Sequence, residues 1–181
     1  ADQATPYLRN LLALSAAMQD EYAPEPSRDA DALTVLLVSD VHSANQYALM
    51  RTIVEEQGVD VVIDSGDLIN LGHVEEARLS NLYGGISSPG VPYVFVSGNH
   101  DRNSPGDTSL LDALGRTRGA EVLQPGPGQY REVSVGGLRI AGFNDPRYYG
   151  DADDGTTEQQ TRARDAWVEA LGDTTPPDVT V

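Results

Sequence analysis

The stretch V-P-Y-V-F-V-S-G-N-H-D, residues 91–101, joins an apolar run to side chains that can bind metal ions. Its apolar part, residues 91–96, has the composition of a buried strand. Asn99, His100 and Asp101 follow this run closely and offer an amide, an imidazole and a carboxylate. The stretch therefore predicts a strand with candidate functional groups just beyond its carboxyl end.

Two earlier segments of the chain end in a similar way. Asp40-Val41-His42 follows the run 33–39, and Gly66-Asp67 follows the run 59–63. Three apolar runs thus lead into metal-ligand residue types. This repetition is hard to produce by accident.

The segments between these runs have the spacing of helices. Apolar residues at helical intervals predict helices over 46–57 and 73–82. Strand, helix, strand, helix, strand is the pattern of a parallel sheet with right-handed crossovers. Because the carboxyl ends of parallel strands meet at one edge, four side chains are expected to converge there: Asp40, His42, Asp67 and Asn99.

The rest of the chain shows weaker patterns. We expect residues 1–30 to form a helix and a linker, and residues 31–181 to form one domain. Beyond residue 101 we expect a helix at 107–114, a strand at 119–123, a hairpin of 130–135 with 138–143, a helix at 156–171 and a strand starting at 178.

The expected crevice also predicts a cation. The carboxylates of Asp40 and Asp67 would repel each other there unless a positive charge lay between them. A divalent metal ion meets this need. Mixed oxygen and nitrogen ligands suit manganese, iron or zinc without deciding among them.

The order D-x-H, G-D, G-N-H-D over residues 33–101 resembles the first half of the signature of the calcineurin-like metallophosphoesterases, enzymes that cleave phosphate esters with two metal ions. The resemblance implies an α/β fold, a four-layer α/β/β/α sandwich with mixed β-sheets. It also implies that Asp40 and His42 bind the first metal, that Asp67 bridges both, and that Asn99 binds the second.

Other roles follow from the same resemblance. His100 would stabilise or protonate the leaving oxygen, and Asp101 would orient a neighbouring group or line the site. Asn70 and His73 are candidates for substrate binding, although His73 can also cap or flank a helix. Arg147 lies in an expected turn and is a third candidate, for a substrate anion.

Two acidic features have alternative interpretations. Asp64 can cap a turn after its strand or line the site. The acidic run Asp151, Asp153 and Asp154 is interpreted as a solvated loop, because its glycine comes too early for a calcium-binding EF-hand.

The later histidine motifs of the family are missing. This chain has only His42, His73 and His100, whereas the family completes its two metal sites with three further histidines. We therefore expect the truncated N-terminal portion of a phosphoesterase acting on mono- or diesters, with two incompletely liganded metals and little activity alone. The alternative is a non-catalytic metal-binding or interaction module on the same scaffold. A nucleotide-binding domain is disfavoured because no glycine-rich loop follows the first strand.

Composition limits the partners. The net charge of −16 repels polyanions, so non-specific nucleic-acid binding is not expected, while bound cations would still admit a small phosphate ester. The absence of cysteine excludes disulfides and thiolate metal sites. No apolar stretch approaches the roughly 20 residues of a membrane span. A start at Ala1 instead of methionine is typical of a processed or trimmed chain, and the compartment stays open.

Overall fold

The computed structural model describes residue 13 and residues 32–150 and 157–181. The N-terminal helix expected before residue 31, apart from Ala13, and the acidic residues Asp151, Asp153 and Asp154 lie outside the described residues. Internal contacts divide the chain into two units, residues 1–32 and 33–181. The fold below is that of the second unit.

Four parallel strands form the first sheet, in the order β1-β2-β3-β4. They are β1 (Val35–Val38), β2 (Val61–Asp64), β3 (Tyr93–Phe95) and β4 (Ala120–Val122). Every residue of β2 and β3 is buried. Near-continuous burial is typical of central strands in a parallel sheet that is covered on both faces.

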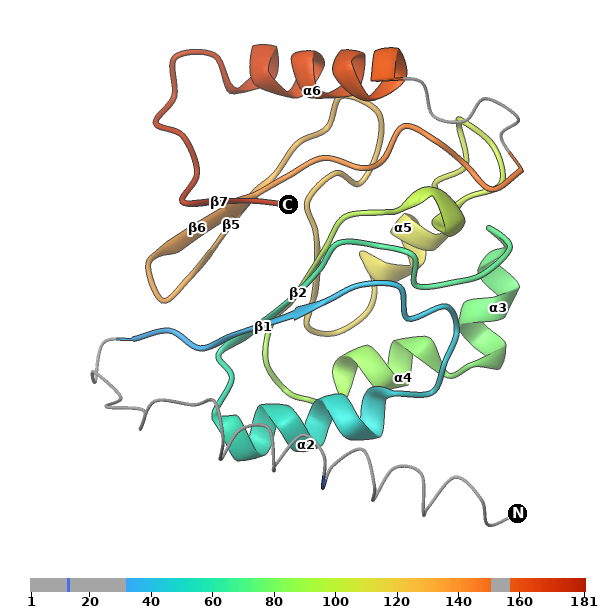
Figure 1. Cartoon of the computed structure of the whole chain (residues 1–181), viewed down its shortest axis with the longest axis vertical. Coiled ribbons are helices and arrows are strands. Elements are labelled where there is room, and N and C mark those ends of the chain that lie inside the picture. Colours follow the sequence, from blue (N-terminus) through green and yellow to red (C-terminus); the bar gives the residue numbers. More distant parts are fainter. Residues whose placement is uncertain (1–12, 14–31, 151–156) are drawn as a thin grey trace. The chain divides into compact units, whose positions relative to one another are not determined.

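Helices cover one face of this sheet. They are α2 (Tyr47–Gln57), α3 (Val74–Leu79), α4 (Leu82–Ser87) and α5 (Ser109–Leu114). Figure 1 shows α2 and α4 on the side of the sheet opposite the other strands. The core between them includes Met50 and Val54 of α2, Leu114 of α5, and Tyr93 and Phe95 of β3.

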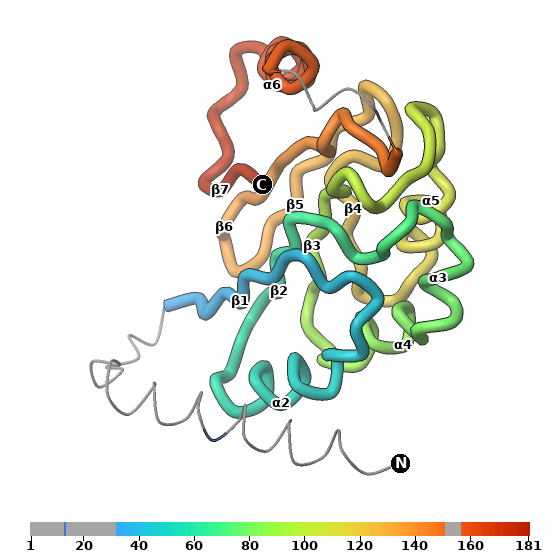
Figure 2. Tube along the Cα trace, turned by 45° about the vertical axis from the view of Figure 1, so that its right-hand side comes forward, coloured from blue at the N-terminus to red at the C-terminus, as the bar shows by residue number. Residues whose placement is uncertain are grey.

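A second sheet covers the other face. It contains β5 (Glu132–Val135), β6 (Leu138–Ala141) and β7 (Val179–Thr180), with β5 antiparallel and β7 parallel to β6. A second apolar core joins the two sheets and contains Ile63, Val94 and Ile140. Helix α6 (Thr157–Leu171) lies beyond the second sheet in both ribbon views (Figures 1 and 2).

The α/β fold expected from the sequence is confirmed, with two corrections. Only the second sheet is mixed, because all four described strands of the first sheet are parallel. The single helix expected at 73–82 is two short helices, since Asn81 adopts a left-handed conformation with φ 55° and ends the helical path. Asparagine tolerates this conformation better than most residues, and helical spacing does not reveal it. Among the described residues, no helix is long and apolar enough to cross a membrane.

The loops that carry the candidate site follow β1, β2 and β3 at the carboxyl edge of the parallel sheet. The third of these loops contains a short 3₁₀ helix, η1 (Asn99–Asp101). Val96, Ser97 and Gly98 join the buried strand β3 to η1. The two cores on the faces of β3 therefore fix where this loop begins.

Candidate metal centre

Backbone hydrogen bonds join the loop after β1 to the loop after β2. The amide of Asp40 donates to the carbonyl of Gly66 at 3.0 Å, and the amide of His42 donates to the carbonyl of Asp67 at 2.9 Å. The two loops therefore hold each other in register. Their side chains are placed by the main chain as well as by packing.

Three candidate ligands in these loops have an uncommon backbone conformation. Asp40, His42 and Asp67 lie in the left-handed region, with φ of 56°, 47° and 61°, and Ser43 in the first loop shares it with φ 57°. Non-glycine residues adopt this region rarely, and each such residue costs on the order of 1 kcal/mol. Strain of this kind persists where the surrounding structure requires it, and it concentrates at functional sites.

The same three residues form a group that could hold a metal ion. One donor atom from each of Asp40, His42 and Asp67 lies within 4.8 Å of the others. His42 Nε2 is 3.6 Å from Asp40 Oδ1. His42 Nδ1 lies 3.3 Å from the carbonyl oxygen of Ile69, and since a carbonyl only accepts, Nδ1 carries the hydrogen in that contact. Neutral His42 therefore keeps the lone pair of Nε2 for a metal ion.

Glycine is required beside Asp67. A Cβ atom on Gly98 would lie 2.1 Å from Asp67 Oδ1, and a Cβ atom on Gly66 would lie 2.2 Å from the amide nitrogen of Gly98. The loops after β2 and β3 thus approach each other too closely for any side chain. The two motif glycines explain why the Asp67 carboxylate can lie against η1.

Asp67 also borders a cavity on the side of Asn99. The cavity has a volume of about 550 Å³, and Asp67, Asn99 and Arg147 contribute to its lining. Helix α6 and Val181 form other parts of the wall. Asp67 therefore belongs to the group with Asp40 and His42, and it also lines the cavity that Asn99 lines.

His100 lies beside the metal group and contacts both Asp67 and His42. Its backbone amide donates to Asp67 Oδ1 at 2.9 Å, and its Nδ1 lies 2.6 Å from the carbonyl oxygen of Asn70. Nδ1 is again the donor, so in the neutral ring Nε2 carries the lone pair. The ring centroids of His42 and His100 are 4.8 Å apart, and that of Tyr149 lies 5.4 Å from His100.

The carboxylate of Asp101 is buried and holds the loops together. It accepts hydrogen bonds from four backbone amides, those of Asp67, Leu68, Ile69 and Gly98, at 2.8 to 3.2 Å. Burial raises the pKa of Asp101 to about 7, and the backbone hydrogen bonds oppose this rise. This environment suits a residue that orients its neighbours.

Comparison with known proteins agrees with this geometry. A model of calcineurin-like phosphoesterases matches residues 33–180. The chain belongs to the calcineurin-like phosphoesterase family.

Solved structures support the fold of this calcineurin-like phosphoesterase. A crystal structure matches with a TM-score of 0.53 and 13% identity, over 81% of this chain and 66% of that chain. At this identity the likeness shows the fold alone, and the parallel four-strand sheet with a mixed three-strand sheet is consistent with a metallophosphoesterase. The chain thus spans 66% of that relative's length. No curated protein gives a significant match.

Asn70 connects the histidines His42 and His100. Its Nδ2 donates to the carbonyl of His42 at 2.9 Å, and its own carbonyl accepts from His100. The amide of Asn70 donates to Glu76 Oε2 at 2.9 Å, which ties the loop to α3. Asn70 thus links the His42 main chain to the His100 side chain.

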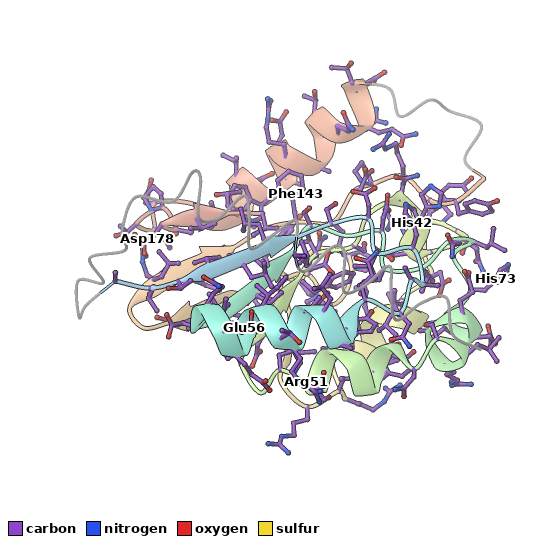
Figure 3. The ribbon with its side chains drawn as sticks, turned by 60° about the horizontal axis from the view of Figure 1, so that its bottom comes forward. His42, Arg51, Glu56, His73, Phe143 and Asp178 are labelled. Carbon is purple, nitrogen blue, oxygen red and sulfur yellow. The ribbon has the colours of Figure 1, made fainter. Side chains whose placement is uncertain are left out.

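His73 and Arg147 lie outside the three-residue metal group. His73 is the residue before α3, is exposed, and has Nδ1 3.1 Å from Asn103 Nδ2. Figure 3 shows it at the periphery of the ribbon, beyond His42. The guanidinium of Arg147 pairs with Asp145, with an Nε to Oδ1 distance of 2.9 Å, where it contributes to the cavity wall.

Asp64 is a turn cap at the end of β2. Its Oδ1 accepts the amide of Gly66 at 2.8 Å, and its Oδ2 accepts the hydroxyl of Tyr93. Burial raises the pKa of Asp64 to about 7 against the lowering effect of these two hydrogen bonds. Of the two sequence interpretations, the turn cap is the one observed.

Tyr149 was not anticipated from the sequence. It lies in a segment without regular spacing after the second hairpin strand, so no periodic pattern points to it. Its place beside His100 depends on contacts between segments more than 40 residues apart in the chain, which a single sequence does not reveal.

Proposed function

We propose that this calcineurin-like phosphoesterase hydrolyses phosphate mono- or diesters at a binuclear metal site, of which this chain carries the first half. The main support is the position of Asp67. Its carboxylate belongs to the metal-compatible group with Asp40 and His42, and it also lines the cavity that contains Asn99. A carboxylate that lies with the donors Asp40 and His42 and also faces a cavity lined by the donor Asn99 is the arrangement expected of a bridging ligand.

In this proposal each donor has a stated place. Asp40 and His42 Nε2 would hold the first ion, Asp67 would contact both, and the amide oxygen of Asn99 would hold the second. Carboxylate, imidazole and amide donors fit manganese, iron or zinc. Divalent ions at this site would supply Lewis acidity toward the phosphoryl oxygens.

The other residues act on substrate or on their neighbours. As an imidazolium, His100 would keep its Nδ1 hydrogen on the Asn70 carbonyl, give its Nε2 proton to the leaving oxygen and become the neutral Nδ1–H tautomer. Asp101 is a positioning residue, since its carboxylate is occupied by backbone amides. Arg147 would face a substrate anion from the cavity wall, while Asn70 and His73 would lie at the margin of the substrate.

The proposal extends to the whole domain. We place a domain from residue 31 onward, built as a four-layer α/β/β/α sandwich, after an N-terminal helix and linker. Strand β7 reaches the cavity, because Thr180 and Val181 line it. The family completes its two metal sites with three further histidines, and this edge of the cavity is where we propose that they would lie.

Hydrolysis of p-nitrophenyl phosphate and bis(p-nitrophenyl) phosphate with Mn²⁺ tests the proposal. The 181-residue chain is expected to be nearly inactive, and a longer product with the later histidines is expected to hydrolyse at least one ester. In that product, His100→Ala should lower turnover by about 10²- to 10⁴-fold. Its metal content should stay nearly unchanged, because the bond from the backbone amide to Asp67 is kept.

The control is His73→Ala, which should have a much smaller effect because His73 lies outside the metal group. Complete inactivity of the longer product toward both esters, with metal bound, would contradict the enzyme and favour the non-catalytic metal-binding or interaction module.

A further inference from the structure

Three aromatic rings form a row of successive contacts, from His42 of the metal group through His100 to Tyr149. The rings of His42 and His100 are nearly perpendicular, at 89°, and the ring of Tyr149 meets that of His100 at 51°. Tyr149 is 39% exposed, so the row ends at solvent. The roles of the metal ligands do not require an exposed aromatic ring at this position.

The main chain holds Tyr149 in this place. The amide of Tyr149 donates to the carbonyl of Arg102 at 2.8 Å, and Arg102 Nε donates to the carbonyl of Arg147 at 2.9 Å. The guanidinium of Arg102 also donates to the carbonyl of Asp145. Because Arg102 directly follows η1, these bonds tie the segment 145–149 to the element that carries His100. The side chain at position 149 can therefore change without releasing the segment.

The orientation of the His100 ring decides which part of a substrate would lie near Tyr149. Nδ1 is engaged with Asn70, so a leaving oxygen would meet Nε2. The group attached to that oxygen would then lie beside the His100 ring. Among the described residues, Tyr149 is the exposed aromatic side chain in ring contact with His100.

We propose that Tyr149 is a specificity-determining residue that favours phosphate esters whose leaving group is a planar aromatic ring. The proposal rests on the proposed function, because it requires a phosphoryl group at the metals and a leaving group at His100. Offset or edge contacts between two aromatic rings strengthen binding by roughly 2- to 10-fold beyond simple burial. An alkyl group of similar size makes no such contact.

The test uses two phosphonates that cannot be hydrolysed. Benzylphosphonate replaces the ester oxygen of phenyl phosphate by a methylene group, and cyclohexylmethylphosphonate is its aliphatic counterpart of similar size. Each is titrated into the chain at a Zn²⁺ concentration that saturates the group of Asp40, His42 and Asp67, and binding is followed by the NMR shifts of the His100 amide and ring. Wild type is compared with Tyr149→Leu, which removes the ring, and Tyr149→Phe, which keeps it.

The wild type and Tyr149→Phe are expected to bind benzylphosphonate about 2- to 10-fold more tightly than cyclohexylmethylphosphonate. In Tyr149→Leu the ratio should fall to about one, with unchanged affinity for cyclohexylmethylphosphonate. A ratio that is the same in wild type and Tyr149→Leu would overturn the role of Tyr149 while leaving the phosphoesterase proposal intact. Absence of binding of both phosphonates in the presence of Zn²⁺ would instead contradict the proposed function, and the role of Tyr149 with it.

Discussion

At the scale of single residues, the absence of a side chain at Gly98 decides where the Asp67 carboxylate lies. Gly98 has an ordinary φ of −83°, so its importance comes from space and not from backbone freedom. The sequence motif pointed to this glycine, but only the structure shows that the space is filled by the Asp67 carboxylate.

We predict that Gly98→Ala weakens metal binding by roughly 10-fold or more, because the new methyl group displaces the Asp67 carboxylate. Overpacking should also lower the free energy of unfolding by about 1–3 kcal/mol. The matched control is Gly106→Ala, whose Cβ would meet no atom within 4 Å. Calorimetry and urea unfolding measure both effects, and wild-type affinity in Gly98→Ala would refute the steric account.

A second prediction at this scale concerns Asp64 and pH. Its pKa of about 7 in the folded protein exceeds the value of about 3.9 for an unfolded aspartate. The folded state therefore binds the proton more tightly, and stability falls as pH rises from about 4 to about 7, then levels off. Asp101 contributes in the same direction.

Asp64→Asn should make this fall shallower, because an amide cannot ionise and its oxygen can still accept from Gly66. Urea unfolding at about pH 4.5 and about pH 7.5, with EDTA present to remove metal ions, measures the difference. If the free energy of unfolding falls equally in wild type and Asp64→Asn between these two pH values, ionisation of Asp64 is not the cause of the pH dependence.

At the scale of elements, sequence periodicity predicted the parallel strands and their helices because each strand is a buried apolar run and each helix has one apolar side. It also placed Asp40, His42, Asp67 and Asn99 just beyond strand ends, which is where they lie. It missed the break at Asn81, since a single left-handed residue leaves the apolar spacing unchanged. It also could not foresee that Asp101 would bind four amides from two loops.

The break between α3 and α4 leads to a prediction about the stability of Asn81 variants. Asn81→Ala should lower the free energy of unfolding by about 1 kcal/mol, because a left-handed conformation is costly for residues with an ordinary Cβ. Asn81→Gly should be close to neutral or slightly stabilising, since glycine adopts this conformation readily. Urea unfolding of both variants provides the test. Equal stability of Asn81→Ala and wild type would mean that the two helices do not depend on this conformation.

At the scale of the whole molecule, two cores hold the parallel sheet between helices on one face and a second sheet on the other. Strands β2 and β3 belong to both cores, so the loops that follow them start from fixed positions. The partner of β7 could not be predicted from the sequence, because its parallel pairing with β6 joins segments about 40 residues apart. Long-range pairing of this kind depends on the packed fold and not on local pattern.

The central claim is that Asp40, His42 and Asp67 together hold a divalent ion, and calorimetric titration with Mn²⁺ tests it most directly. The 181-residue chain should bind weakly, because its ligand shells are incomplete, and Asp67→Ala should show no binding. The control Glu121→Ala removes an exposed carboxylate on β4 and should bind as wild type does. Tight binding of two ions by the chain, or binding that survives in Asp67→Ala, would contradict the account.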